Sequence, residues 1–156
     1  MNYHEAPNRK LNHIQRDDSL FLAGSISGAF DWQKDVANNL IQYYHIFNPR
    51  RVDYNIEDRA MEVTQITWEY DHLKFCKHIM FFFAPETLAP ITLFEYGAML
   101  VENSTRFKTV WVCIHPDYKR KRDVEIQTHL RGMPIAEGKF FYNLDEMVKT
   151  MIKFRS

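Results

Sequence analysis

Glycine-rich phosphate cradles are missing from this sequence. Only five of its 156 residues are glycine, and neither GxGxxG nor the GxxxxGKS and GxxxxGKT patterns occur. The segment GSISG, residues 24–28, has neither spacing, and no GxSxG nucleophile elbow is present. These absences argue against a dinucleotide cradle, the usual triphosphate cradle and a serine hydrolase of the elbow type.

Metal motifs and cysteine pairs are also missing. The two cysteines, Cys76 and Cys113, are not spaced as a metal site or a redox pair, and the seven histidines form no HExxH motif. We therefore predict no metal and no cofactor, and cysteines that are buried and reduced.

Neither a long apolar run nor an excess of one charge is present. Residues 1–18 contain no apolar stretch typical of a secretory signal, and no uncharged apolar segment is long enough to cross a bilayer. Twenty basic residues balance twenty acidic ones. We expect a soluble, cytoplasmic protein that binds no membrane and no long nucleic acid, with small molecules as its partners.

The chain has enough apolar material for one domain. Hydrophobic residues make up 46% of the sequence and aromatic residues 15%. A length of 156 residues suffices for one core but is short for two domains of ordinary size. Residues 1–18 are polar and lack periodicity, so we interpret them as an arm that precedes a domain formed by residues 19–156.

Short apolar runs alternate with helical patterns in that domain. The apolar runs predict strands at residues 19–23, 45–48, 78–83, 109–114 and 139–142. The helical patterns predict helices at residues 31–44, 60–76, within 84–103, and at 124–131 and 144–154. The alternation predicts an α/β fold whose parallel sheet is covered by helices on both faces. Ligands in such folds bind where the strands end, on one rim of the sheet.

Two glutamates are candidates for chemistry at this rim. Glu95 lies near the start of the helix that follows strand 78–83, where it either points into the ligand crevice or complements the positive helix end. Glu69 lies four residues after Gln65, on the same helical face. If that face looks into the crevice, two carboxylates can divide the roles of nucleophile and proton donor. The alternative is that Glu69 and Asp71 are solvated helix residues.

Three further features have both a structural and a functional interpretation. Gly24 permits either a tight turn or the close approach of a ligand to the backbone. Asp31 is a plausible helix cap. The basic run KRKR, residues 119–122, is either a solvated loop or a site for phosphate, whose oxygens match a guanidinium group.

Taken in order, four segments resemble one enzyme family. These segments are FLAGSI with DW following, NPRR, QITWE and PITLFEYG. They are similar to segments of the nucleoside 2-deoxyribosyltransferase family, in particular its nucleoside 2-deoxyribosyltransferase-like branch. The similarity runs from about Phe21 to Val124. It implies a single flavodoxin-like or Rossmann-like domain with about five strands, and an enzyme that moves 2-deoxyribose between nucleobases. Some relatives hydrolyse the N-glycosidic bond instead.

The resemblance also implies roles for individual residues. The family's nucleophile, a glutamate at the start of a helix, falls on Glu95 of FEYG, and the acidic residue that assists the departing base falls on Glu69 of QITWE. The substrate-binding residues that it implies are Gly24, Ser25, Asp31, Trp32, Arg50, Gln65, Asp71, Thr92 and Arg120. It further implies a homo-oligomer, because a neighbouring subunit completes the active site in this family.

The sequence differs from the family pattern at Lys77, Ala89 and Asp123, so base contacts are not carried over. We expect a deoxyribosyltransferase that acts, without a cofactor, on a 2′-deoxynucleoside or its 5′-monophosphate and a free nucleobase. One alternative is a deoxynucleoside N-glycosidase with water as the acceptor. Another is a nucleotide-binding sensor without catalysis.

Overall fold

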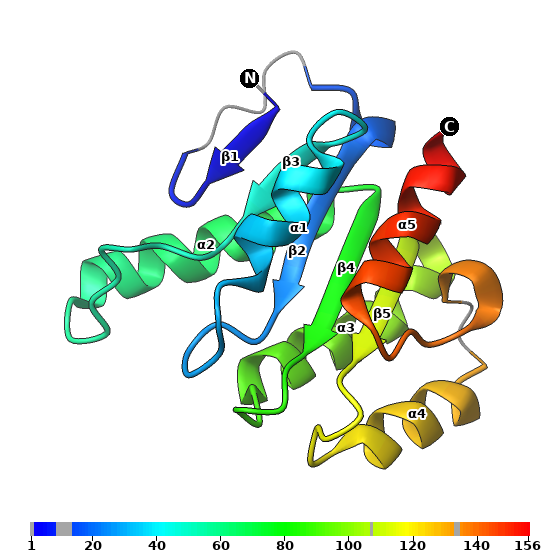
Figure 1. Cartoon of the computed structure of the whole chain (residues 1–156). Coiled ribbons are helices and arrows are strands. Elements are labelled where there is room, and N and C mark those ends of the chain that lie inside the picture. The colour runs from blue at the N-terminus through cyan, green and yellow to red at the C-terminus, as the bar shows by residue number, and fades with distance from the viewer. Residues whose placement is uncertain (1, 9–13, 107, 133–134) are drawn as a thin grey trace.

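A parallel β-sheet forms the centre of the molecule (Figure 1). The computed structural model describes residues 2–8, 14–106, 108–132 and 135–156. In this part of the chain the sheet has five strands in the order β1-β3-β2-β4-β5, and every pairing is parallel. The strands are β1 (Tyr3–Glu5), β2 (Ser19–Gly24), β3 (His45–Asn48), β4 (His78–Phe83) and β5 (Thr109–Ile114).

Helices cover both faces of the sheet. They are α1 (Trp32–Leu40), α2 (Arg59–Phe75), α3 (Pro90–Arg106), α4 (Lys121–Leu130) and α5 (Leu144–Arg155), with short 3-10 helices at Arg16–Asp18 and Ala136–Gly138. Side chains alternate between the faces, as in any strand. Leu20 and Leu22 of β2 pack in the core beneath α1 and α5, whereas Phe21 and Ala23 pack in the core beneath α2 and α3. The predicted α/β, flavodoxin-like domain is therefore confirmed.

The position of the fifth strand differs from the prediction. Residues 139–142 form no strand, because Phe141 makes a single parallel bridge to Cys113 before the chain enters α5. The fifth strand is β1, which lies within the segment interpreted as a polar arm and pairs with β3 at the edge of the sheet. A three-residue strand with polar side chains gives no apolar pattern, so the sequence does not reveal it.

Local signals fix where the main helices begin. The Asp31 side chain accepts a hydrogen bond from the backbone N–H of Lys34, which confirms its role as the cap of α1. Asp58 caps α2 and Asn143 caps α5 in the same way. Pro90 opens α3, where a missing N–H costs nothing. No helix in the described ranges has the length and apolar character needed to cross a membrane.

A buried lysine closes the carboxyl end of α2. Lys108 lies directly before β5, and its Nζ donates to the carbonyl oxygens of Leu73 at 2.6 Å, Lys74 at 2.9 Å and Cys76 at 2.6 Å. An ammonium group has three donors, so one side chain satisfies carbonyls that a helix end leaves without partners. Its positive charge also suits the negative end of the helix dipole. Lys108 thereby fixes α2, the helix that carries Glu69, against the sheet.

We predict that Lys108→Met lowers the free energy of unfolding by about 2–4 kcal/mol, because the buried carbonyls lose charge-assisted hydrogen bonds. Urea denaturation followed by circular dichroism measures this loss. The control is Lys149→Met on α5, where the lysine is exposed and the change removes only a surface charge. Equal destabilisation by the two substitutions would contradict the capping role.

Candidate active site

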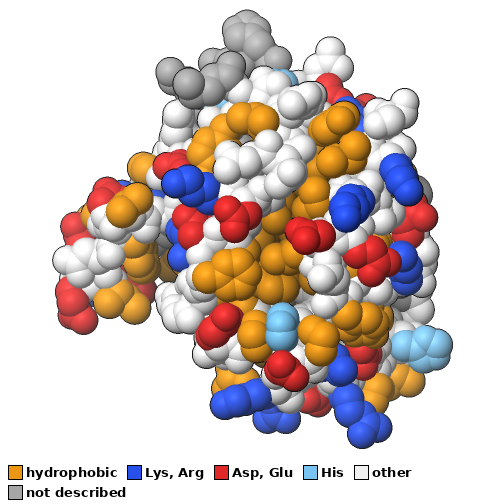
Figure 2. Space-filling model, viewed as in Figure 1, with side chains coloured by type: hydrophobic (Ala, Val, Ile, Leu, Met, Phe, Trp, Pro, Cys, Tyr) orange, Lys and Arg blue, Asp and Glu red, His pale blue; other side chains and the backbone are white. Residues whose placement is uncertain are grey.

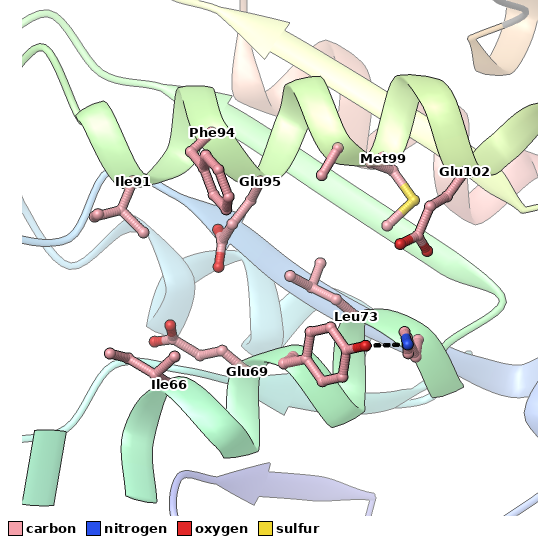
Figure 3. A pocket seen from close by; sticks show the side chains of 11 residues that line it. Ile66, Glu69, Leu73, Ile91, Phe94, Glu95, Met99 and Glu102 are labelled. Atoms are coloured by element: carbon pink, nitrogen blue, oxygen red, sulfur yellow. Dashed lines mark hydrogen bonds between the residues drawn. The ribbon is translucent and has the colours of Figure 1, made fainter. Parts of the chain in front are cut away.

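A groove between α2 and α3 encloses a cavity of about 340 Å³ on one face of the sheet (Figure 3). Its walls are one stripe from each helix. The lining residues are Ile66, Glu69, Tyr70, Leu73 and Lys74 from α2, and Ile91, Phe94, Glu95, Ala98, Met99 and Glu102 from α3. In both stripes the residues are spaced by one, three or four positions, which is the spacing of one helical face. The groove is therefore built directly by the helical periodicity of the two segments.

The two candidate catalytic glutamates meet in this groove. Glu95 points from α3 and Glu69 from α2 toward the same space (Figure 3). Burial among apolar side chains and, as a smaller cause, the negative charge of Glu69 together raise the pKa of Glu95 to about 8. Burial also raises the pKa of Glu69. Because two carboxylates in one apolar site resist ionising together, the pair retains a proton at neutral pH.

Gln65 donates a hydrogen bond to Glu69. Its side-chain nitrogen donates to Oε1 of Glu69 at 2.7 Å and to the carbonyl oxygen of Pro49 at 2.7 Å. Pro49 follows directly after β3, so this amide links the position of Glu69 to the sheet. The hydrogen bond from Gln65 lowers the pKa of Glu69, against the larger effect of burial.

The guanidinium group of Arg50 makes hydrogen bonds to other parts of the chain. Nη2 donates to the carbonyl oxygens of Ile26, Ala29 and Phe30, at 3.3, 3.3 and 3.0 Å. Nε donates to Oε1 of Gln33 at 3.0 Å and lies 3.3 Å from the Asp31 carboxylate. In this structure Arg50 and Asp31 therefore shape the loop after β2, and neither lines the cavity.

Gly24 ends β2, Ser25 follows it, and Trp32 begins α1. A Cβ on Gly24, where φ is 151°, would lie 2.5 Å from the carbonyl oxygen of Phe82 and 2.7 Å from the Trp32 ring. The Ser25 hydroxyl accepts from the N–H of Ala84 at 3.0 Å, and Trp32 Nε1 donates to the Ser25 carbonyl at 2.8 Å. These contacts join β2 to β4 and α1, so the close approach that requires glycine here is between parts of the chain.

The remaining predicted binding residues lie away from the cavity walls. Thr92 is buried near the start of α3, Asp71 is on α2 two residues after Glu69, and neither lines the groove. Arg120 is exposed directly before α4 and forms an ion pair with Asp123 at 3.4 Å. The structure thus brings Glu69, Glu95 and Gln65 together and distributes the others over the surrounding loops and helices.

The apolar lining of the groove was not predicted. Ile66 on α2 and Ile91 and Phe94 on α3 are respectively 56%, 65% and 76% exposed, although they flank the two glutamates. The signal in the sequence is a helical stripe that contains a carboxylate among apolar residues. Such a stripe is ordinarily read as core, and only the relative position of two helices shows that it lines an open groove.

No group of three potential metal ligands occurs in the part of the chain that the structure describes. The groove offers carboxylates from Glu69, Glu95 and Glu102, and an ammonium from Lys74, which lies over the Tyr70 ring. Its chemistry is therefore that of carboxyl groups in an apolar setting. Such a setting suits the stabilisation of a developing positive charge and the transfer of protons.

Comparison with known families agrees with this arrangement. The pattern of the family described as nucleoside 2-deoxyribosyltransferase like matches residues 17–118, which include β2 to β5 and both candidate glutamates. The comparison with curated proteins found no match. Because the family pattern spans more than half of the chain, this protein belongs to the nucleoside 2-deoxyribosyltransferase-like family.

The raised pKa of Glu95 predicts a pH-dependent gain in stability for Glu95→Gln. The pKa of Glu95 is 4.5 in ordinary surroundings and about 8 in the folded chain. The folded chain is therefore not destabilised by this group below pH 4.5, and it loses stability as the pH rises from 4.5 through 8. We expect the variant to exceed the wild type by roughly 3 kcal/mol at pH 9 and by much less at pH 5. Urea denaturation at both pH values measures the difference.

The control is Glu86→Gln, which removes an exposed carboxylate from the loop before α3. It is expected to change stability equally at the two pH values. A Glu95→Gln variant that is no more stable than the wild type at pH 9 would show that Glu95 ionises there without cost.

Proposed function

We propose that this protein cleaves the N-glycosidic bond of a 2′-deoxynucleoside or its 5′-monophosphate and transfers the deoxyribose to another nucleobase. The observation that carries the proposal is the pair of facing carboxyl groups, Glu69 and Glu95, in one apolar groove. The pair retains one proton at neutral pH, and the reaction requires one carboxylate and one carboxylic acid. Membership of the family supports the same class of chemistry.

In the first step the ionised Glu95 attacks the anomeric carbon of the sugar. The bond from that carbon to the base nitrogen breaks, its electron pair goes to the base, and Glu69 supplies the proton that the base takes up. The transition state resembles an oxocarbenium ion, which a nearby carboxylate stabilises. The product is a glycosyl ester on Glu95 and a free base.

In the second step the acceptor base attacks the same carbon. The ester bond to Glu95 breaks, its electron pair returns to the carboxylate, and the ionised Glu69 takes the proton of the incoming base. Both steps invert the anomeric carbon, so the overall reaction retains configuration. The two glutamates return to their starting state, which means that no cofactor takes part.

An N-glycosidase with water as the acceptor is the second candidate. The groove is open in the single chain, where Phe94 and Ile91 beside Glu95 are 76% and 65% exposed. Water that reaches the glycosyl ester would hydrolyse it. Transfer to a base requires that the open side be covered, because excluding water protects a reactive intermediate.

We infer that a second copy of the chain covers this side. Ile66 on α2 and Ile91 and Phe94 on α3 are exposed beside the groove, and the start of α2 with its preceding loop projects from the body of the domain (Figure 2). The projecting segment carries Val52, Ile56 and Val63, which are also exposed. We further propose that this homo-oligomer acts in nucleotide salvage in the cytoplasm.

Arg120 is proposed to select a 5′-phosphate. It lies in the loop after β5, on the same rim as the loop before α3, and the two loops are joined by the hydrogen bond from Tyr118 to the carbonyl oxygen of Leu88 at 2.8 Å. A guanidinium group in this position can bind a phosphate bidentately once it leaves Asp123. The nucleoside monophosphate would then be preferred over the free nucleoside.

The test is incubation with each deoxynucleoside and deoxynucleoside 5′-monophosphate, with and without an isotopically labelled free base, followed by mass-resolved chromatography. We predict that label appears in a new nucleoside or nucleotide with the wild type and with Glu86→Gln, and not with Glu95→Gln. Glu69→Gln is expected to slow the reaction by about 10²- to 10⁴-fold, the usual effect of losing a general acid.

Release of base without uptake of label would instead identify the glycosidase. Binding of a nucleotide with no turnover in any mixture would support the sensor and contradict catalysis. A preference for monophosphates that disappears in Arg120→Gln would support the role of Arg120.

A further inference from the structure

The hydrogen bond from Gln65 distinguishes the two side-chain oxygens of Glu69. Gln65 lies one helical turn before Glu69 on α2 and is only 6% exposed. Its side-chain nitrogen makes both of its hydrogen bonds within the chain, to the carbonyl oxygen of Pro49 and to Oε1 of Glu69, each at 2.7 Å. An amide nitrogen has two hydrogens, so its donor capacity is fully used.

The orientation of this amide follows from Pro49. A backbone carbonyl oxygen can only accept, so the Gln65 atom at 2.7 Å from it has to be the NH₂ group and not the amide oxygen. The second hydrogen of that group then points to Oε1 of Glu69. Because Pro49 follows β3 directly, the contact also holds the donor at a fixed place relative to the sheet.

Oε1 of Glu69 is consequently an acceptor in either protonation state of the carboxyl group. A proton on Glu69 must reside on the other oxygen, Oε2. We propose that Gln65 is a positioning residue that reserves Oε1 of Glu69 as an acceptor, so that Oε2 alone exchanges a proton with Glu95 and with the base. This inference rests on the proposed function for its catalytic meaning, but its structural part can be tested without turnover.

The charged and titratable groups around Glu69 do not supply this function. From α3, the carboxyl groups of Glu95 and Glu102 face the same groove. From α2, Lys74 lies over the ring of Tyr70 at 4.1 Å from its centroid and donates to the Tyr70 hydroxyl. Burial, and to a smaller extent the charges of Glu62 and Glu69, raise the pKa of Tyr54, which lies in the loop between β3 and α2.

Gln65 is therefore a neutral donor among mostly acidic neighbours. It stabilises the ionised form of Glu69 without adding a positive charge to the groove. The resting proton of the pair is thereby directed to Glu95, whose pKa burial has raised to about 8, and it has to pass to Oε2 of Glu69 before the base departs. Such a device keeps the nucleophile protonated and unreactive until a substrate occupies the groove.

The experiment is a titration of the side-chain carboxyl carbons of Glu69 and Glu95 by NMR in protein labelled with ¹³C-glutamate. The Glu69→Gln and Glu95→Gln variants assign the two signals. In Gln65→Met we expect the midpoint of Glu69 to rise by about one pH unit, the equivalent of one hydrogen bond, and the midpoint of Glu95 to fall. If the enzyme turns over, the acid limb of its pH–rate profile shifts upward by a similar amount.

Gln65→Asn provides a second variant, since it keeps an amide at this position but is too short to reach both acceptors. The matched control is Gln33→Met, which removes the other buried glutamine, one that accepts from Arg50 and contacts neither glutamate. Unchanged midpoints in both folded Gln65 variants would overturn the proposal, and so would an equal shift in Gln33→Met. Failure of the proposed function would appear separately, as an absence of turnover with the titration shifts intact.

Discussion

Two carboxyl groups in one apolar groove cannot both be ionised without a large electrostatic cost, and the proposed chemistry of this protein depends on that constraint. Glu95 and Glu69 approach each other from α3 and α2, and burial raises the pKa of both. The shared proton gives the site an acid and a base at the same time. A solvated pair of the same residues would lose this property, because water would stabilise both charges.

The fold maintains the constraint by fixing the two helices independently. Pro90 starts α3 directly after the loop at the end of β4, which places Glu95 in the second turn of the helix. On α2, Asp58 caps the first turn, Lys108 holds the last carbonyls, and Gln65 links the middle of the helix to the end of β3. The groove between the helices therefore stays open even though its walls are apolar.

The central strands and main helices could be predicted from the sequence, because each carries its own hydrophobic pattern. Strand β1 could not be predicted, because its three residues are polar and depend on pairing with β3 for their structure. The segments FEYG and QITWE identified Glu95 and Glu69 as candidates. Only the structure shows that the two side chains line one groove. Arg50 shows the limit most clearly. A rim arginine suggests a ligand contact, but its guanidinium group is engaged by the backbone of the neighbouring loop, and no sequence pattern reveals the direction of a side chain.

The most direct test of the central claim is mass spectrometry of the wild-type protein, quenched rapidly in acid during turnover of a deoxynucleoside or its monophosphate. The account predicts a mass increase equal to one deoxyribosyl or phosphodeoxyribosyl group, located by peptide fragmentation on Glu95. Release of base with no adduct at any time, or with an adduct on another residue, would contradict the assignment of Glu95 as the nucleophile.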